Sequence, residues 1–100
     1  MRTVVEDRTL PRPYVGPDAL ARIAVAFPKY IALPSSELVL RIAIPIGMTG
    51  LQQVVVDIAP SGADSPGASG TTVRAYGKEG LLSRKPTART ADQIVSVLSS

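Results

Sequence analysis

The stretch GTTVRAYGKEGLLSRKPTARTADQIVSVL, residues 70–98, decides the predicted fold, because it joins a strand to a closing helix through a basic connection. Its first part alternates apolar Val73 and Ala75 with polar Arg74 and Tyr76. This alternation is typical of a strand that buries one face and exposes the other. The following residues, 77–87, combine glycine and basic residues without periodicity, and we expect them to be irregular.

The closing helix is predicted to begin at Pro86 or at Thr90. Proline suits the first turn of a helix, whereas Thr90 and Gln93 have the spacing of a capping box. An apolar stripe along this helix is formed by Ala91, Ile94, Val95 and Leu98. Residues at this spacing share one helical face, so we expect the helix to lie against a sheet.

The rest of the chain supplies that sheet and one more helix. A helix is predicted from Pro17 to Phe27, with Leu20, Ile23, Ala24 and Phe27 on one face. Strands are predicted over 3–9, 37–44 and 51–58, with a short one over 30–33 and a flexible, Gly/Ser/Pro-rich loop over 59–70. On the strands over 37–44 and 51–58, Arg41 and Asp57 are placed to form a cross-strand ion pair.

These elements predict a single α+β domain over residues 1–100. Their order is β-α-(β)-β-β-β-α, with an antiparallel sheet of four to five strands packed against two helices. The sheet should bury one face beneath the helices and leave the other uncovered.

Composition excludes several kinds of chemistry. The chain has no cysteine and no histidine, so disulfides, thiolate metal sites and histidine bases are ruled out. No apolar run approaches the roughly 20 residues that a membrane-spanning helix needs. We therefore expect a cytoplasmic protein with no metal, no cofactor and no membrane span.

Catalysis is also not expected. The loop from Gly62 to Ser69 resembles a phosphate-binding loop only superficially, because Ala68 stands where that motif requires lysine. The adjacent acids Glu6 and Asp7 face opposite sides of a strand and cannot form one acid–base pair. The sequence therefore predicts a protein that is not an enzyme.

The strand-to-helix order of residues 70–98 resembles the C-terminal end of the helix-grip proteins. These are the START or Bet v 1-like superfamily, also called polyketide cyclase/dehydrase-like or SRPBCC. The front of the chain, with PDALARIAVAFPKY after a first strand, is similar to the same family. The resemblance implies a shortened helix-grip, in which a curved sheet wraps the last helix around an apolar or lipid-like ligand. A generic two-layer α+β sandwich without a cavity is the alternative.

The leading functional hypothesis is accordingly a small binding module for an apolar molecule held between the sheet and the C-terminal helix. The residues expected to line the pocket are the apolar ones on the two helices and the last strand. They are Leu20, Phe27, Val73, Ala91, Ile94, Val95 and Leu98.

A second hypothesis rests on surfaces. Residues 74–89 hold five basic residues against one acid, whereas the rest of the chain holds six basic residues against seven acids. The basic residues, Arg74, Lys78, Arg84, Lys85 and Arg89, are either solvated or form a surface for an anionic partner; nucleic acid is less favoured, because no nucleic-acid-binding motif accompanies them. The sheet face that carries Val39 and Val55 is apolar enough to pair with another subunit, but residue types leave open whether it is solvated or an interface. If it is an interface, we expect a homo-oligomer or a structural subunit that binds a protein partner.

Overall fold

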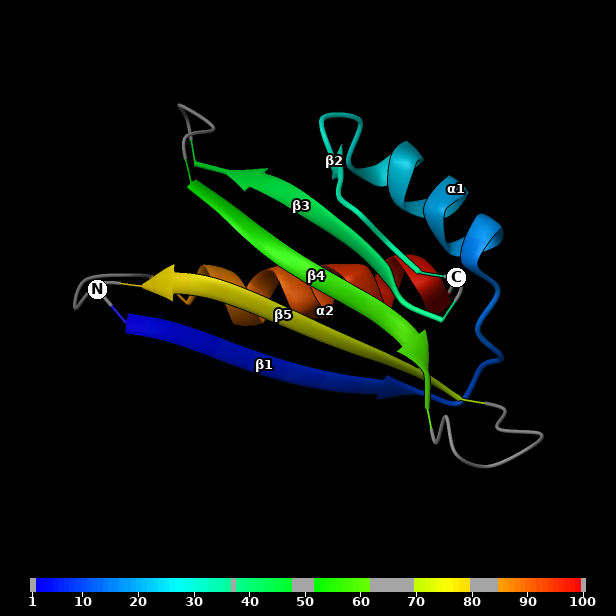
Figure 1. The fold of residues 1–100 in the computed structure, drawn as a ribbon. Coiled ribbons are helices and arrows are strands. Elements are labelled where there is room, and N and C mark those ends of the chain that lie inside the picture. Colours follow the sequence, from blue (N-terminus) through cyan, green and yellow to red (C-terminus); the bar gives the residue numbers. More distant parts are fainter. Residues whose placement is uncertain (1, 37, 48–51, 62–69, 80–84, 100) are drawn as a thin grey trace.

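Five strands and two helices follow one another in the order that the sequence predicts. The computed structural model describes residues 2–36, 38–47, 52–61, 70–79 and 85–99. The elements are β1 (Arg2–Leu10), α1 (Gly16–Ala26), β2 (Ile31–Ala32), β3 (Leu40–Ile46), β4 (Gln52–Pro60), β5 (Thr71–Glu79) and α2 (Pro86–Ser99) (Figure 1). The expected α+β class, with an antiparallel sheet and two helices, is confirmed.

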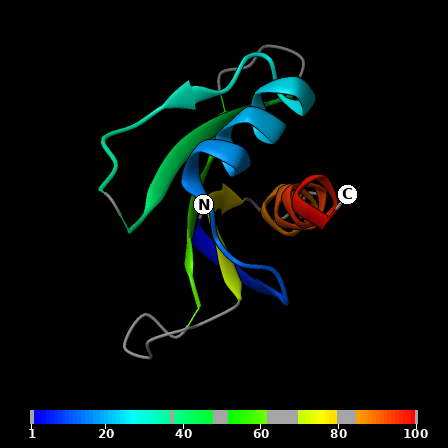
Figure 2. The same ribbon diagram turned by 90° about the vertical axis from the view of Figure 1, so that its right-hand side faces the viewer.

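The sheet has the strand order β1-β5-β4-β3-β2, and every neighbouring pair is antiparallel. The first strand of the chain therefore lies beside the last one, which it pairs from Arg2↔Glu79 to Leu10↔Thr71. Both helices lie on the same side of the sheet (Figure 2). The other side carries no helix, as the alternating pattern of the strands predicts.

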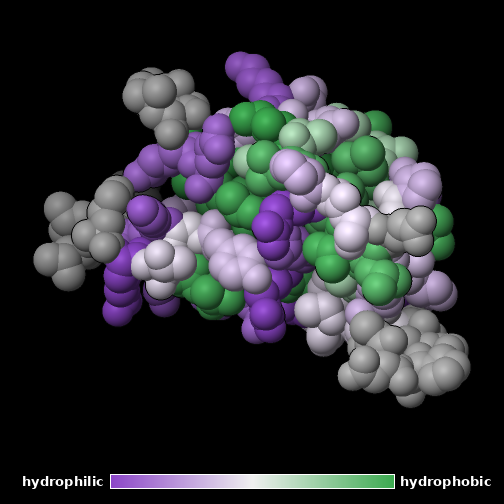
Figure 3. All heavy atoms as spheres, viewed as in Figure 1, coloured by the Kyte–Doolittle hydropathy of each residue, from purple (hydrophilic) through white to green (hydrophobic). Residues whose placement is uncertain are grey.

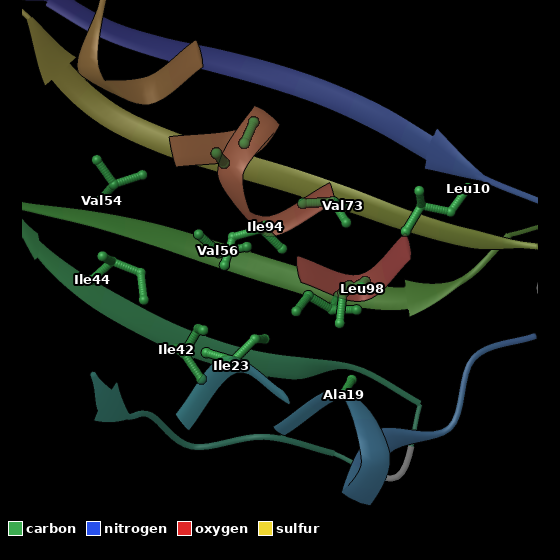
Figure 4. Packing of buried hydrophobic residues seen from close by; sticks show 13 residues of the cluster. Leu10, Ala19, Ile23, Ile42, Ile44, Val54, Val56, Val73, Ile94 and Leu98 are labelled. Carbon is green, nitrogen blue, oxygen red and sulfur yellow. The ribbon is translucent and has the colours of Figure 1, made fainter. Parts of the chain in front are cut away.

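The core lies between the sheet and the helices and is aliphatic. Alternate residues of the strands point into it, so that Val54, Val56 and Ile58 of β4 are fully buried, as are Val73 and Ala75 of β5. From the helices it receives Ala19, Ile23, Ala91, Ile94 and Leu98 (Figure 4). This packing supplies the main stabilisation of the fold, because burial of apolar surface is its dominant favourable term.

Helix α1 begins where the prolines and acids of its sequence indicate. Pro17 occupies the first turn and Asp18 lies near the positive end of the helix dipole, where it also accepts a bond from Arg22 Nε at 3.0 Å. The buried face is turned slightly from the predicted stripe: Ala19 and Ile23 are buried, whereas Leu20 is only partly so.

Two strands run further than the sequence predicts at the ends next to prolines. β3 includes Pro45, which lies just beyond the strand predicted over 37–44. β2 pairs only with Ile42 and Ala43, so at Pro45 this strand is an edge and the missing N–H is tolerated. β4 includes the first two residues of the predicted loop over 59–70, because its pairing with β5 continues to Pro60↔Thr71. Residues 62–69 lie outside the described residues.

The last strand is also longer than predicted. Residues 77–79 were expected to belong to an irregular connection, but they continue β5 because β1 pairs with them at Arg2, Thr3 and Val4. Pairing with β1, which comes from the other end of the sequence, thus extends β5. The three added residues carry Gly77, Lys78 and Glu79 up to the start of α2, where the candidate site lies.

Candidate functional site

The sheet splits at one end, between β4 and β5. Their pairing runs from Pro60↔Thr71 to Val55↔Tyr76, and both strands then continue on separate paths. β4 stays paired with β3 as far as Gln52, and β5 stays paired with β1 as far as Glu79. Figure 1 shows these two strand ends diverging in front of the start of α2.

A cavity of about 260 Å³ occupies this opening. Its wall comes from the ends of β3, β4 and β5 and from the first two residues of α2. The lining residues are Ile46, Gln52, Gln53, Val54, Gly77, Lys78, Pro86 and Thr87. We call this space the split cavity; it lies between the ends of the strands and the first turn of the C-terminal helix.

A hydroxyl group without a partner forms part of the wall of the split cavity. Thr87 is fully buried, and its Oγ1 has no hydrogen-bond partner within the described part of the chain. The hydroxyl lies directly over Gly77: a Cβ at that position would collide with Thr87 Oγ1. An unpaired buried hydroxyl costs about 1–3 kcal/mol.

The first turn of α2 is held by an acid from the sheet. The Thr87 N–H donates to Glu79 Oε2 at 3.0 Å, and Glu79 itself is buried. A carboxylate at this place satisfies a free amide of the helix and complements the positive end of its dipole. The sequence offered Pro86 or Thr90 as the helix start; the helix begins at Pro86, and its cap comes from β5.

Because Glu79 already complements the helix N-terminus, the split cavity is not a simple anion site. Its accessible polar groups are those of the exposed residues Gln52, Gln53 and Lys78, since the Thr87 hydroxyl is buried. Its accessible apolar surface comes from Ile46 and Pro86. The lining therefore suits a molecule with an apolar body and a polar or negatively charged end.

The seven residues predicted to line a pocket lie in or against the core. Val73, Ala91, Ile94 and Leu98 are buried, and the partly buried Leu20, Phe27 and Val95 pack against the same cluster. None of them lines the split cavity. Leu98 alone among them borders another, smaller cavity, a space of about 30 Å³ at the other end of α2.

This small cavity is bounded by the linker after β1 and by the start of α1. Tyr14 lies in its wall, and partial burial raises the pKa of the Tyr14 hydroxyl above its usual value. The Thr71 hydroxyl donates to the Arg12 carbonyl at 2.7 Å, and Arg12 Nη1 donates to the Leu98 carbonyl at 2.8 Å. The space is about that of one water molecule, so we assign it a structural role.

The basic residues of 74–89 do not share one surface. Arg74 lies on the uncovered face of the sheet, where Asp7 holds it, and Lys78 borders the split cavity. Lys85 immediately precedes α2 with a φ of 55°, and Arg89 follows one turn later. Arg84 lies outside the described residues. The structure thus places Lys78 at a cavity and neutralises Arg74.

The uncovered face of the sheet carries a row of alternating charges. The predicted pair of Arg41 and Asp57 is confirmed: Nε donates to Oδ1 at 2.7 Å and Nη2 to Oδ2 at 2.9 Å. On the other two strands, Arg74 Nε donates to Asp7 Oδ1 at 2.6 Å. The register aligns all four as Arg41–Asp57–Arg74–Asp7, from β3 to β1. These hydrogen bonds raise the pKa values of Arg41 and Arg74 above that of a free guanidinium.

An apolar row accompanies the charged one. Val5, Tyr76 and Val55 lie opposite one another on β1, β5 and β4. Val39 does not join them as predicted: it precedes β3 in a turn in which its N–H donates to Ser36 Oγ at 3.1 Å and its carbonyl accepts from the Ser36 N–H at 3.0 Å. Figure 3 shows the uncovered face, with hydrophilic residues crossing its middle between hydrophobic ones.

No family model matches this chain, and the searches of curated proteins and of solved structures also found no match. Among the described residues, no cluster of acids forms a metal site. No helix in that part of the chain is long and apolar enough to cross a bilayer. The split cavity and the uncovered face of the sheet are therefore the features from which we infer function.

Proposed function

We propose that this protein binds a small amphipathic molecule in the split cavity and catalyses no reaction on it. The observation that carries the proposal is the cavity of about 260 Å³ between the diverging ends of β4 and β5. Its volume is just below the range of roughly 300–1,000 Å³ typical of ligand pockets.

The chemistry of the lining sets the class of ligand. The apolar body of the molecule packs on Ile46 and Pro86, while a polar atom hydrogen-bonds to the exposed side-chain amide of Gln52 or Gln53. A negative group at the other end is attracted to Lys78. The resemblance to helix-grip proteins supports the same class, since their ligands lie between a sheet and the last helix.

Anilinonaphthalenesulfonate, an amphipathic anion whose fluorescence rises in apolar surroundings, is a suitable probe. We expect saturable binding of one molecule per folded chain. Lys78→Glu should weaken binding roughly tenfold or more, since reversing a charge at a partly solvated site changes the binding free energy by more than about 1 kcal/mol. Ile46→Trp, which fills the cavity with a larger side chain, should abolish binding.

The matched control is Lys29→Glu, which makes the same change in net charge at an exposed residue outside the cavity. It should leave the affinity within about twofold, as expected for a distant, screened charge. An equal loss in both lysine variants, or the absence of saturable binding to the wild-type protein, would refute the proposal.

Thr87→Val should separate ligand binding from stability. Valine has the shape of threonine without its hydroxyl, so the variant removes the unpartnered polar atom and leaves the packing intact. We expect the free energy of unfolding to rise by about 1 kcal/mol and the affinity for the probe to stay unchanged, because the buried hydroxyl is out of the probe's reach. Urea unfolding and a fluorescence titration on the same preparation measure the two effects; a fall in stability would mean that the hydroxyl has a partner in the folded protein.

A further inference from the structure

We infer that the uncovered face of the sheet binds a second copy of this chain, face to face, about a two-fold axis parallel to the strands. The charged row supplies the argument, because its signs read plus, minus, plus, minus from Arg41 on β3 to Asp7 on β1. In such a row the two end residues have opposite charges, and so do the two central residues.

A two-fold axis along the strands, between β4 and β5, reverses the order of the strands but keeps each position along them. Arg41 then faces Asp7 of the second copy, and Asp57 faces Arg74. Every charge of the row meets the opposite sign. An axis across the strands would instead place Arg41 on Arg41, so charge complementarity selects the first arrangement.

The same axis places the apolar row of one copy opposite the apolar row of the other copy. Val55 of one copy faces Tyr76 of the other, so the apolar row meets an apolar row. The side chains of Arg74 and Arg41 are each 50% exposed, which leaves them accessible to the second copy. Each already has a partner in its own chain, so no charge of the row is left unpaired when the row is covered. The product is an aligned sandwich of two sheets with the helices outside.

An anionic partner fits this face less well. Asp7 and Asp57 cancel the charges of Arg74 and Arg41, so the row has no net charge with which to attract one. Only a surface with the same alternation and spacing complements it, and the chain itself carries such a surface. The inference does not depend on the proposed ligand, because the split cavity and the charged row comprise different residues.

Sedimentation velocity over a range of protein concentrations tests the inference. The wild-type protein should shift from the 10.5 kDa monomer to a species of twice that mass. In the double variant Asp7→Arg/Arg74→Asp the pair within the chain persists with its members exchanged, but each charge of the row would face its own sign. We expect the dimer to weaken by at least about 100-fold, since like-charge contacts across an interface cost several kcal/mol.

A second double variant, whose charged row is complementary to that of the first, separates loss of the dimer from loss of folding. Arg41→Asp/Asp57→Arg should be equally monomeric, and both double variants should retain the circular dichroism of the wild type. An equimolar mixture of the two should form a heterodimer, because their rows are complementary to each other although neither is complementary to itself. A monomeric wild type, a double variant that still dimerises, or a mixture that stays monomeric would overturn the inference.

Discussion

Gly77→Ala should destabilise the protein by about 3 kcal/mol, at the upper end of the usual cost of overpacking. The added Cβ would overlap Thr87 Oγ1, and it would lie 3.3 Å from Thr87 Cβ and 3.6 Å from Val54 Cγ2. The first turn of α2 cannot move away freely, because the Thr87 N–H is bonded to buried Glu79. Replacing a strand glycine by alanine usually stabilises a protein instead, because alanine lowers the conformational entropy of the unfolded chain.

Two double variants identify the atom responsible. Gly77→Ala/Thr87→Ala removes Oγ1 and should regain about 2 kcal/mol of the loss as an interaction energy between the two sites. Gly77→Ala/Thr87→Ser keeps the hydroxyl oxygen and should regain little. Urea unfolding of the wild type, the single variants Gly77→Ala, Thr87→Ala and Thr87→Ser, and the two double variants measures these differences. If Gly77→Ala alone is neutral or stabilising, the hydroxyl does not lie against the glycine.

Ile94→Ala should lower the free energy of unfolding by about 2–5 kcal/mol. Ile94 is fully buried, and Figure 4 shows it among Val56 and Val73 of the sheet. Its removal leaves a cavity under the middle of α2 that the rigid sheet cannot fill by relaxation. Since domains of this size are stable by only about 5–15 kcal/mol in total, the variant should lose a large part of its stability.

This variant also distinguishes a core residue from a ligand-contacting one. Ile94 does not line the split cavity, so the folded fraction of Ile94→Ala should bind anilinonaphthalenesulfonate with unchanged affinity. Val95→Ala, at a partly buried neighbour, is the control and should cost less than Ile94→Ala. A variant that kept its stability but lost the probe would instead assign Ile94 to the binding site.

Much of the fold is predictable from the sequence, because the hydrophobic periodicity and the turn-forming residues indicate the same elements along the chain. Val73 and Ala75 alternate with Arg74 and Tyr76, and the structure buries the first two and leaves Arg74 exposed. The pairing of Arg41 with Asp57 was likewise accessible, since two adjacent strands with a short connection fix their own register. Local patterns are sufficient where the interacting elements are neighbours in sequence.

The split cavity could not be predicted, because it depends on contacts between distant segments. Nothing in the sequence near Gly77 indicates that β1 extends β5 by three residues, or that β4 and β5 separate there. Thr87 and Glu79 belong to residues 77–87, whose sequence is basic and without periodicity and gives no indication of their contact. Gly77 directly follows the predicted strand, and a glycine within a strand often marks a close approach of another segment, but the pattern ended at Tyr76 and gave no reason to extend the strand.

The pairing of β1 with β5 sets a condition on biosynthesis. β1 leaves the ribosome before the rest of the sheet, yet its strand partner begins at Thr71, so β1 waits while residues 11–70 are made. At about 5–20 residues per second the delay is roughly 3–12 seconds, during which the unpaired strand is exposed to other nascent chains. Its central Glu6, Asp7 and Arg8 are charges of the kind that keep such segments from aggregating. Asp7, which later completes the charged face of the sheet, and its neighbours Glu6 and Arg8 thus also protect the first strand before the sheet exists.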